Sequence, residues 1–357
     1  MTDSKVDYRI TLNETNVIKG IAICAMLWHH LFLECHEYGE FTFKLALTCK
    51  VCVALFVFLS GYGMATQFKK VEMNGSFSMY ADVTKFLFKR YFKFYLNYWV
   101  VFFLSVPLGI FVFNRSLELA YGIETNLFLS FLRDVFGFQG YNSYNITWWF
   151  NSLILVLWAF FPILYWALKS KFLCVWILVL LLFNPGGVLK PFVILAIFFL
   201  QYLVVFAFGI CAAVQMDIIN KVLNRVNGYV IFIVSLVMTI LLLYMRNHYV
   251  LYCFLGMKGD PFIAVFLSLT VVSICRLTKM KMSVVACLGK HSMNMYLMHT
   301  FICGYFFCDF IYSFKYPIII FVALLLLSLL LSIAVEFFKK KIHFYQFQQN
   351  VCSFLNK

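Results

Sequence analysis

Charged residues are scarce in this sequence: Asp, Glu, Lys and Arg make up 12% of the 357 residues, against about 25% in soluble domains. Hydrophobic residues make up 64% of the chain. Folded in water, such a chain would expose large apolar patches, which drive association. No stretch is long and polar enough to form a separate soluble domain. The composition therefore excludes a soluble globule and makes lipid the solvent for most of the protein.

The chain also lacks the marks of several other classes of protein. Its first apolar run follows a charged lead at residues 1–16 and has no small-residue cleavage site, so we expect a retained helix rather than a signal peptide. The 12 cysteines show no metal-ligand spacing. The pair Cys49-x-x-Cys52 lies inside an apolar run, where cysteine behaves as a small hydrophobe. We therefore predict neither a metal site nor a permanently bound cofactor.

Apolar runs near the length needed to cross a bilayer, about 20 residues, occur at ten places. Charged, Pro-rich or Gly-rich breaks separate them, and they lie near Val17–Leu33, Lys44–Thr66, Phe94–Phe113, Thr147–Leu168, Phe172–Phe183, Pro191–Gln215, Gly228–Met245, Pro261–Cys275, Val284–Cys308 and Pro317–Phe338. A further run at Asn126–Phe138 is too short and too charged to span, and we interpret it as an interfacial or re-entrant piece. The sequence thus predicts an all-α polytopic membrane protein of about ten transmembrane helices. Its single domain comprises a lead at 1–16, a helix bundle at 17–338 and a basic tail at 339–357.

The net charge of +14 is unevenly distributed along the chain. Lys and Arg concentrate in every second connection between the apolar runs, and the cytoplasmic side of a membrane protein carries that excess. This pattern predicts that both termini are cytoplasmic. Basic charge next to membrane ends also suits anionic lipid headgroups, so we predict membrane lipids and no nucleic acid as partners.

Ionisable residues inside apolar runs are costly and often functional. In the first run His30 follows Lys19 by eleven residues, which on a helix is a separation of about 16 Å. In the ninth run His299 lies about 14 Å beyond Lys290 by the same measure. Two imidazoles at similar depth suit acid–base work on a hydroxyl. A structural role for either one stays open, as does the choice between His30 and its neighbour His29.

A basic cluster, Lys89, Arg90 and Lys93, precedes the third apolar run on the predicted cytoplasmic side. Such cations bind phosphates, and Arg is suited to bidentate contacts. Plain anchoring by the positive-inside rule is the alternative interpretation.

Five short motifs follow one another along the chain. Ten residues separate Lys19 from His30, LFVFLSGYG occupies Leu55–Gly63, and KRYFKFYLNYW contains Arg90 and Lys93. Next comes TWWFNSL at Thr147–Leu153, and LGKHSMNMYLMH then supplies Gly289, Ser292, Tyr296, Leu297 and His299. In this order the motifs resemble the acyltransferase 3 family of integral-membrane O-acyltransferases, over essentially the whole chain. The sequence departs from the family pattern by having Lys19 and Lys93 for Arg, Asn16 for Asp and Leu96 for Pro.

The resemblance implies transfer of an acyl group, commonly acetyl from acetyl-CoA, to a hydroxyl of a carbohydrate or lipid-linked glycan. It implies His30 as general base, with Lys19 and His299 as further catalytic candidates. The donor, acyl-CoA, would bind at Lys89, Arg90 and Lys93, with Ser60 and Tyr62 as further candidates. We expect a bacterial cytoplasmic (inner) membrane, and assembly into a homo-oligomer stays open.

Two other functions compete with this prediction. A transporter or glycan carrier would use the histidines and Lys50 as a proton path, although the matching broken helices typical of inverted repeats are not visible in the sequence. A structural membrane partner of a glycan-assembly complex is the third.

Overall fold

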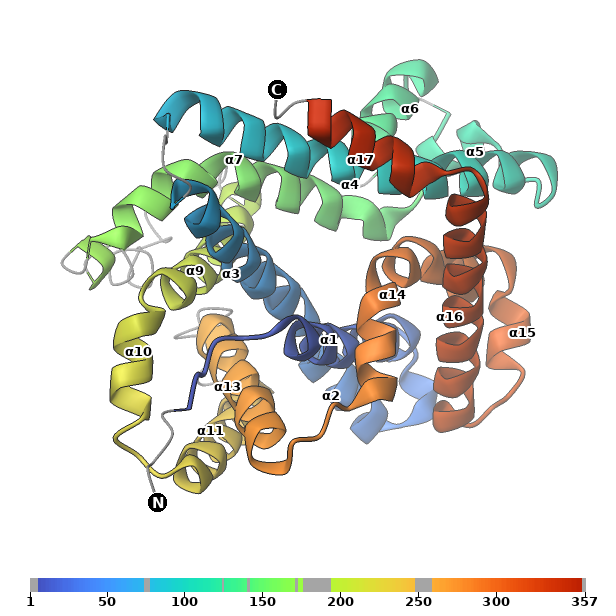
Figure 1. Cartoon of the computed structure of the whole chain (residues 1–357). Coiled ribbons are helices and arrows are strands. Elements are labelled where there is room, and N and C mark those ends of the chain that lie inside the picture. The colour runs from blue at the N-terminus through green and yellow to red at the C-terminus, as the bar shows by residue number, and fades with distance from the viewer. Residues whose placement is uncertain are drawn as a thin grey trace. The chain divides into compact units, whose positions relative to one another are not determined.

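The computed structural model describes residues 6–73, 78–123, 125–139, 142–170, 173–175, 194–247 and 259–354. Within these ranges the chain is helical and contains no strand (Figure 1). Six described helical segments are long and apolar enough to cross a membrane, and a bent pair, Gln201–Val214 with Met216–Leu223, makes a seventh if counted as one span. The six are Glu40–Glu72, Tyr80–Phe111, Ile146–Lys169, Gly228–Arg246, Asp260–Thr278 and Pro317–Lys341. The all-helical, multi-pass prediction is confirmed, whereas the count of ten and the location of the termini stay predictions.

Two helices differ in extent from the predicted runs. The second run consists of α2 (Glu40–Cys49) and α3 (Cys52–Glu72), which are separated at Lys50 and Val51. Helix α4 (Met79–Phe111) begins well before the predicted Phe94, so the basic cluster lies on a helix rather than in a connection. The predicted fifth run lies outside the described residues apart from 173–175.

The two helices that carry the candidate histidines form where the first and ninth runs are predicted. They are α1 (Leu12–Phe32) and α14 (Ser283–Thr300), and neither is among the candidate spans. Polar residues such as Lys19 and His291 lower the hydropathy of these segments. The polar residues that make these helices functional candidates thus also lower the hydropathy by which a span is recognised.

The chain forms two compact units, and two of the three boundaries between them fall within α7 (Trp149–Lys169) and α14. Unit 1 comprises Met1–Gly75 and Phe160–Lys290, and unit 2 comprises Ser76–Ala159 and His291–Lys357. Each unit is described by itself below.

Unit 1 is built around the contact between α3 and α9 (Ile194–Val214) (Figure 1). A Cβ atom on Gly61 would overlap the carbonyl oxygen of Phe206, and one on Gly209 would overlap that of Phe58. Small residues at a helix crossing let the two backbones approach closely. Gly61 belongs to the SGYG motif, so this motif has a packing role. Helices α10 (Met216–Leu223), α11 (Gly228–Asn247) and α13 (Asp260–Thr278) complete the unit.

Helix α1 packs in the same way on the first turns of α14. A Cβ atom on Gly20 would overlap the carbonyl oxygen of Val285, and one on Gly289 would overlap that of Asn16. Gly289 opens the last motif, which therefore also contributes a helix contact.

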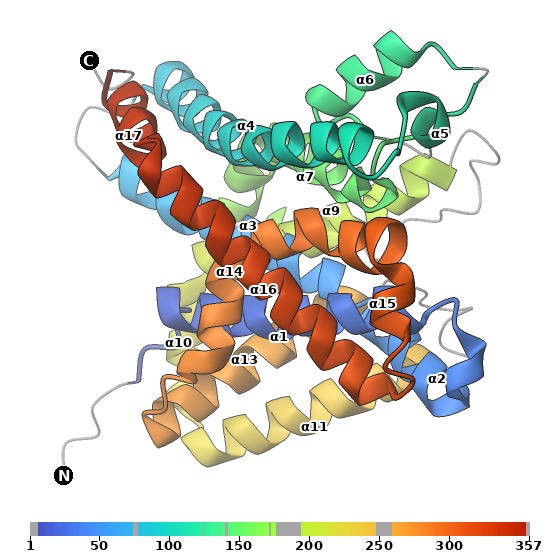
Figure 2. The same ribbon diagram turned by 90° about the vertical axis from the view of Figure 1, so that its right-hand side faces the viewer.

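Unit 2 contains α4, the start of α7 and the end of α14, followed by a π-helical turn at Phe301–Phe306. Its remaining helices are α5 (Leu117–Tyr121), α6 (Leu127–Val135), α15 (Cys308–Tyr312), α16 (Pro317–Lys341) and α17 (Phe344–Phe354). Helix α6 corresponds to the piece predicted not to span, and it is not among the candidate spans. The described part of the predicted basic tail, residues 339–354, comprises the last turn of α16 and α17 (Figure 2).

Candidate functional site

Lys19 and His30 lie on one uninterrupted helix, α1. The helix starts at a capping box: Thr11 Oγ1 accepts from the Glu14 N–H at 3.3 Å, and the Glu14 carboxylate accepts from the Thr11 N–H at 2.7 Å. Since the helix is continuous, the two side chains keep the expected axial separation of about 16 Å. Both are half-buried in unit 1.

The neighbouring histidines have different surroundings. His29 is buried, and its Nδ1 donates to the carbonyl oxygen of Ala46 on α2 at 2.7 Å. His30 is half-buried, with its ring centroid 5.1 Å from that of His29 in an edge-on arrangement. The first histidine thus serves the contact between α1 and α2, while the second turns to another side of the helix.

Unit 1 contains a buried pair of opposite charges that the sequence did not predict. Arg246 Nε lies 2.8 Å from Asp260 Oδ1, and both side chains are buried. Arg246 also donates to the Leu47 carbonyl oxygen at 2.9 Å, and Lys50 interacts electrostatically with the pair. The sequence singles out Lys50, whereas Asp260 looks like an ordinary charge at the start of an apolar run. Its position beside Pro261 at a helix start was the available signal.

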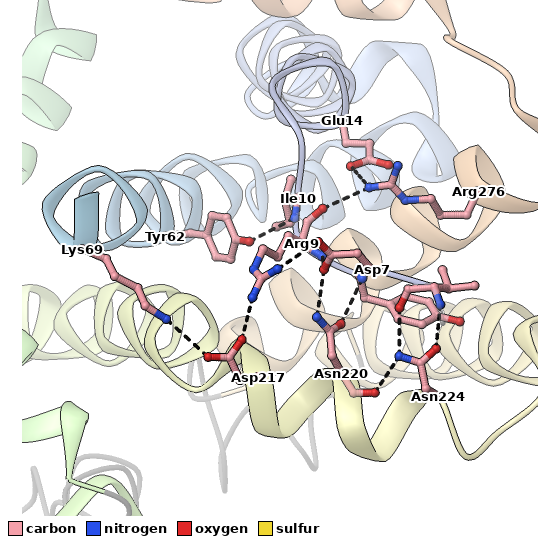
Figure 3. Close-up of polar contacts among 12 residues, drawn as sticks. Asp7, Arg9, Ile10, Glu14, Tyr62, Lys69, Asp217, Asn220, Asn224 and Arg276 are labelled. Carbon is pink, nitrogen blue, oxygen red and sulfur yellow. Dashed lines mark hydrogen bonds and ion pairs between the residues drawn. The ribbon is translucent and has the colours of Figure 1, made fainter. Parts of the chain in front are cut away.

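Ser60 and Tyr62 lie on α3, also in unit 1. The buried Tyr62 hydroxyl accepts a hydrogen bond from the Ile10 N–H at 3.0 Å. Figure 3 shows this contact within a network that ties the N-terminal lead to the unit, including Arg9 to Asp217 at 2.5 Å and Arg276 to Glu14 at 3.3 Å. Tyr62 therefore anchors the segment that precedes α1.

The predicted phosphate-binding cations lie on α4 in unit 2. Lys89 and Lys93 are four residues apart and therefore share one face of the helix. The Arg90 guanidinium lies over the Trp158 ring, 4.7 Å from its centroid. Its buried Nε has no hydrogen-bond partner among the described residues. Arg90 follows Lys89 directly and therefore points to another side of the helix, toward Trp158. This part of α4 thus carries three cations, which suit phosphate as a ligand.

His299 lies fully buried near the end of α14. Its Nδ1 is 2.7 Å from the Tyr296 carbonyl oxygen, and because a carbonyl only accepts, Nδ1 carries a proton. Nε2 lies 3.3 Å from Thr300 Oγ1, which in turn lies 2.8 Å from Thr147 Oγ1. A chain of hydroxyl groups thus connects His299 with the turn that precedes α7.

Lys339, at the start of the predicted basic tail, has contacts that the sequence did not reveal. It is 1% exposed, and its ammonium donates to Asn97 Oδ1 at 2.9 Å, Asn294 Oδ1 at 3.2 Å and Glu336 Oε1 at 2.9 Å. Three acceptors satisfy all three donors of the ammonium. Tyr345 also donates to Glu336. Lys339 therefore connects α4, α14 and α16 within unit 2.

The structure groups the predicted site residues by unit. Lys19, His30, Ser60 and Tyr62 lie in unit 1, and the others, Lys89, Arg90, Lys93 and His299, lie in unit 2. A shared cavity for His30 and His299 stays a prediction.

A family model described as an acyltransferase domain matches residues 12–337. The chain belongs to the acyltransferase 3 family. The match covers nearly the whole chain and confirms the resemblance inferred from the five motifs. No curated protein and no solved structure matches the chain. Family membership supports acyltransferase activity, and together with the apolar helices it supports an integral, multi-pass membrane protein.

Proposed function

We propose that this member of the acyltransferase 3 family is an O-acyltransferase of the bacterial inner membrane. It moves an acetyl or other short acyl group from cytosolic acyl-CoA to a hydroxyl of a carbohydrate or lipid-linked glycan. The family match over residues 12–337 carries the proposal. Acyl-CoA is a co-substrate, and no permanently bound cofactor is required.

His30 is the general base of the proposed reaction. Its imidazole accepts the proton of the acceptor hydroxyl as the hydroxyl oxygen bonds to the thioester carbonyl carbon. The carbon–sulfur bond then breaks, and the CoA thiolate receives the proton from the His30 imidazole. Two observations support His30 over His29: the Nδ1 of His29 is bonded to the Ala46 carbonyl oxygen, and His29 is the more buried of the two.

Lys19 and the cations of α4 serve the donor. Lys19 lies about 16 Å along the helix from His30 and is therefore too far away to contact the reacting atoms at His30. The Lys19 ammonium instead contacts a polar part of acyl-CoA away from the thioester. Lys89, Arg90 and Lys93 bind the phosphates. The Trp158 ring lies against one face of the Arg90 guanidinium, and the buried Nε of Arg90 is a donor without a hydrogen-bond partner among the described residues.

Proteoliposomes that contain the full chain, acceptor glycan and radiolabelled acetyl-CoA test this function. We expect CoA release and labelled glycan. His30→Ala should lower the turnover by about a hundredfold to ten-thousandfold, the usual contribution of a general base. His29→Ala, which removes the neighbouring imidazole, should retain turnover. A wild-type chain that releases no CoA, or a His30→Ala variant with normal turnover, contradicts the proposal.

Donor binding is tested separately by Arg90→Lys. This change keeps the charge and removes the guanidinium fork and its stacking. We expect KM for acetyl-CoA to rise about tenfold, as loss of one charge-assisted hydrogen bond would produce, with KM for the acceptor unchanged. An unchanged KM for acetyl-CoA would instead favour plain membrane anchoring by this cluster.

A further inference from the structure

Asn145, in the turn before α7, has a buried side-chain amide of which only the oxygen has hydrogen-bond partners among the described residues. It is 0% exposed, and its Oδ1 accepts from the Thr147 N–H at 3.0 Å and from the Thr147 hydroxyl at 2.7 Å. Because a backbone N–H can only donate, it fixes which end of the amide is the oxygen. The Nδ2 donor is therefore left over, and it has no hydrogen-bond partner among the described residues.

Two further amides in the same segment have unused groups. Gln139 Nε2 donates to the Asp134 carbonyl oxygen at 3.1 Å, which leaves Oε1 as an acceptor without a partner in the described part of the chain. Asn151 is 1% exposed, and its buried Nδ2 is a donor without a hydrogen-bond partner among the described residues. An unmatched buried polar group costs about 1–3 kcal/mol, so native proteins keep few of them. A group of three within residues 139–151 indicates a polar ligand.

The chemistry of these atoms narrows the class of ligand. The atoms without a partner within residues 139–151 are amide donors and an amide acceptor. Hydroxyl groups both donate and accept, so a polyhydroxyl compound matches this set. Sugars are such compounds.

The Asn145 amide is connected to His299 by two hydroxyls. Thr147 Oγ1 bonds to Asn145 Oδ1, Thr300 Oγ1 lies 2.8 Å from Thr147 Oγ1, and His299 Nε2 lies 3.3 Å from Thr300 Oγ1. The π-helical turn starts directly after Thr300. Such turns are rare and occur frequently at functional sites. The unused amide thus belongs to a network that ends at an imidazole.

We infer that Asn145 binds the acceptor of acyl transfer, its Nδ2 donating to an oxygen of a polyhydroxyl ligand, with Thr147 and Thr300 linking this site to His299. The inference rests on the proposed function and adds the location of the acceptor. Asn145 is a binding residue, and the two threonines are positioning residues.

Asn145→Asp tests the inference, because it keeps Oδ1 for Thr147 and replaces the unused donor by an oxygen. Membrane vesicles from cells that produce the full chain provide the acceptor as their own glycan fraction, and radiolabelled acetyl-CoA is added. We expect acetyl incorporated into glycan to fall about tenfold to a hundredfold, the range for one lost hydrogen bond to a buried group. KM for acetyl-CoA should not change. Normal incorporation by Asn145→Asp overturns the inference.

The matched control is Asn126→Asp. Asn126 Oδ1 caps the exposed start of α6 by accepting from the Leu129 N–H at 3.1 Å, so the same substitution there should leave incorporation at the wild-type level. If Asn145→Asp fails to accumulate, Thr300→Val and Thr300→Ser take its place. The valine should lower incorporation and the serine, which keeps the hydroxyl, should restore it; equal rates overturn the inference. A wild-type chain that incorporates no acetyl overturns the proposed function itself.

Discussion

Two buried aspartates, one in each unit, are held in opposite ways. Asp260 in unit 1 is 1% exposed and faces the Arg246 guanidinium at 2.8 Å. Asp134 in unit 2 is 0% exposed and accepts from neutral donors, the Tyr144 N–H at 2.7 Å and the Tyr121 hydroxyl at 3.1 Å. The nearby Arg133 is exposed and donates to the Asn142 carbonyl oxygen at 2.8 Å.

The difference shows that the partner, rather than burial, determines how an acid is accommodated. A buried charge needs a countercharge, and Arg246 supplies one to Asp260. Without a guanidinium in contact, burial raises the pKa of the Asp134 carboxyl to about 6, although its hydrogen bonds with Tyr144, Ser143 and Tyr121 and the charge of Arg133 act in the opposite direction. These hydrogen-bond donors to the Asp134 carboxyl in unit 2 are neutral, and Asn145 follows directly after one of them, Tyr144.

The largest effect should come from breaking the charge pair of unit 1. Asp260→Asn keeps the shape of the side chain and leaves Arg246 buried without its countercharge, which should cost about 3–5 kcal/mol of stability. Thermal unfolding of the detergent-solubilised full chain measures the loss. Asp217→Asn is the matched control, because Asp217 pairs with Arg9 at an exposed position and should contribute less than about 1 kcal/mol. Equal losses at the two sites would remove the distinction between buried and exposed pairs.

The second-largest effect should be the change in stability with pH that the titration of Asp134 causes. Its pKa is higher in the folded protein, about 6, than the ordinary value of 3.8. The folded state therefore loses stability as the pH rises from about 4 to about 6, by about 3 kcal/mol in total. The free energy of unfolding, measured across this pH range, should decline in the wild type. In Asp134→Asn the contribution of about 3 kcal/mol from Asp134 should be absent. Identical pH profiles would mean that Asp134 does not titrate in this range.

The sequence predicted the helices well because hydrophobic runs are a local signal. It predicted α1 with the separation of Lys19 and His30, and it predicted that α6 does not span. It missed the early start of α4, since charged residues interrupt the segment before Phe94 and leave no apolar run there. The family was likewise accessible, because each motif is a short local pattern.

The interactions of the candidate site could not be read in this way because they join distant residues. Lys339 has the same local context as Lys340 and Lys341, and only its contact with Asn97, 242 residues away, shows that it is not an ordinary charge at a membrane end. Thr147 meets Thr300 across 153 residues. Asn145 is similar, since its significance lies in a donor that the fold leaves without a partner.

The smallest effect should come from Tyr121→Phe, which sharpens the account of Asp134. The change removes one neutral donor, at 3.1 Å, from the carboxyl group. A hydrogen bond to a charged acceptor is worth about 1.5–3 kcal/mol and one to a neutral acceptor about 1 kcal/mol. The variant should therefore lose more stability at pH 7, where Asp134 is ionised, than at pH 4, where it is protonated. Because the lost bond favoured the charged form, the midpoint of the pH-dependent decline in stability should also move to higher pH.

Tyr80→Phe, at a position 85% exposed, controls for the loss of a hydroxyl elsewhere. A loss that is the same at both pH values would show that Tyr121 serves packing alone and that the charge of Asp134 depends on other donors.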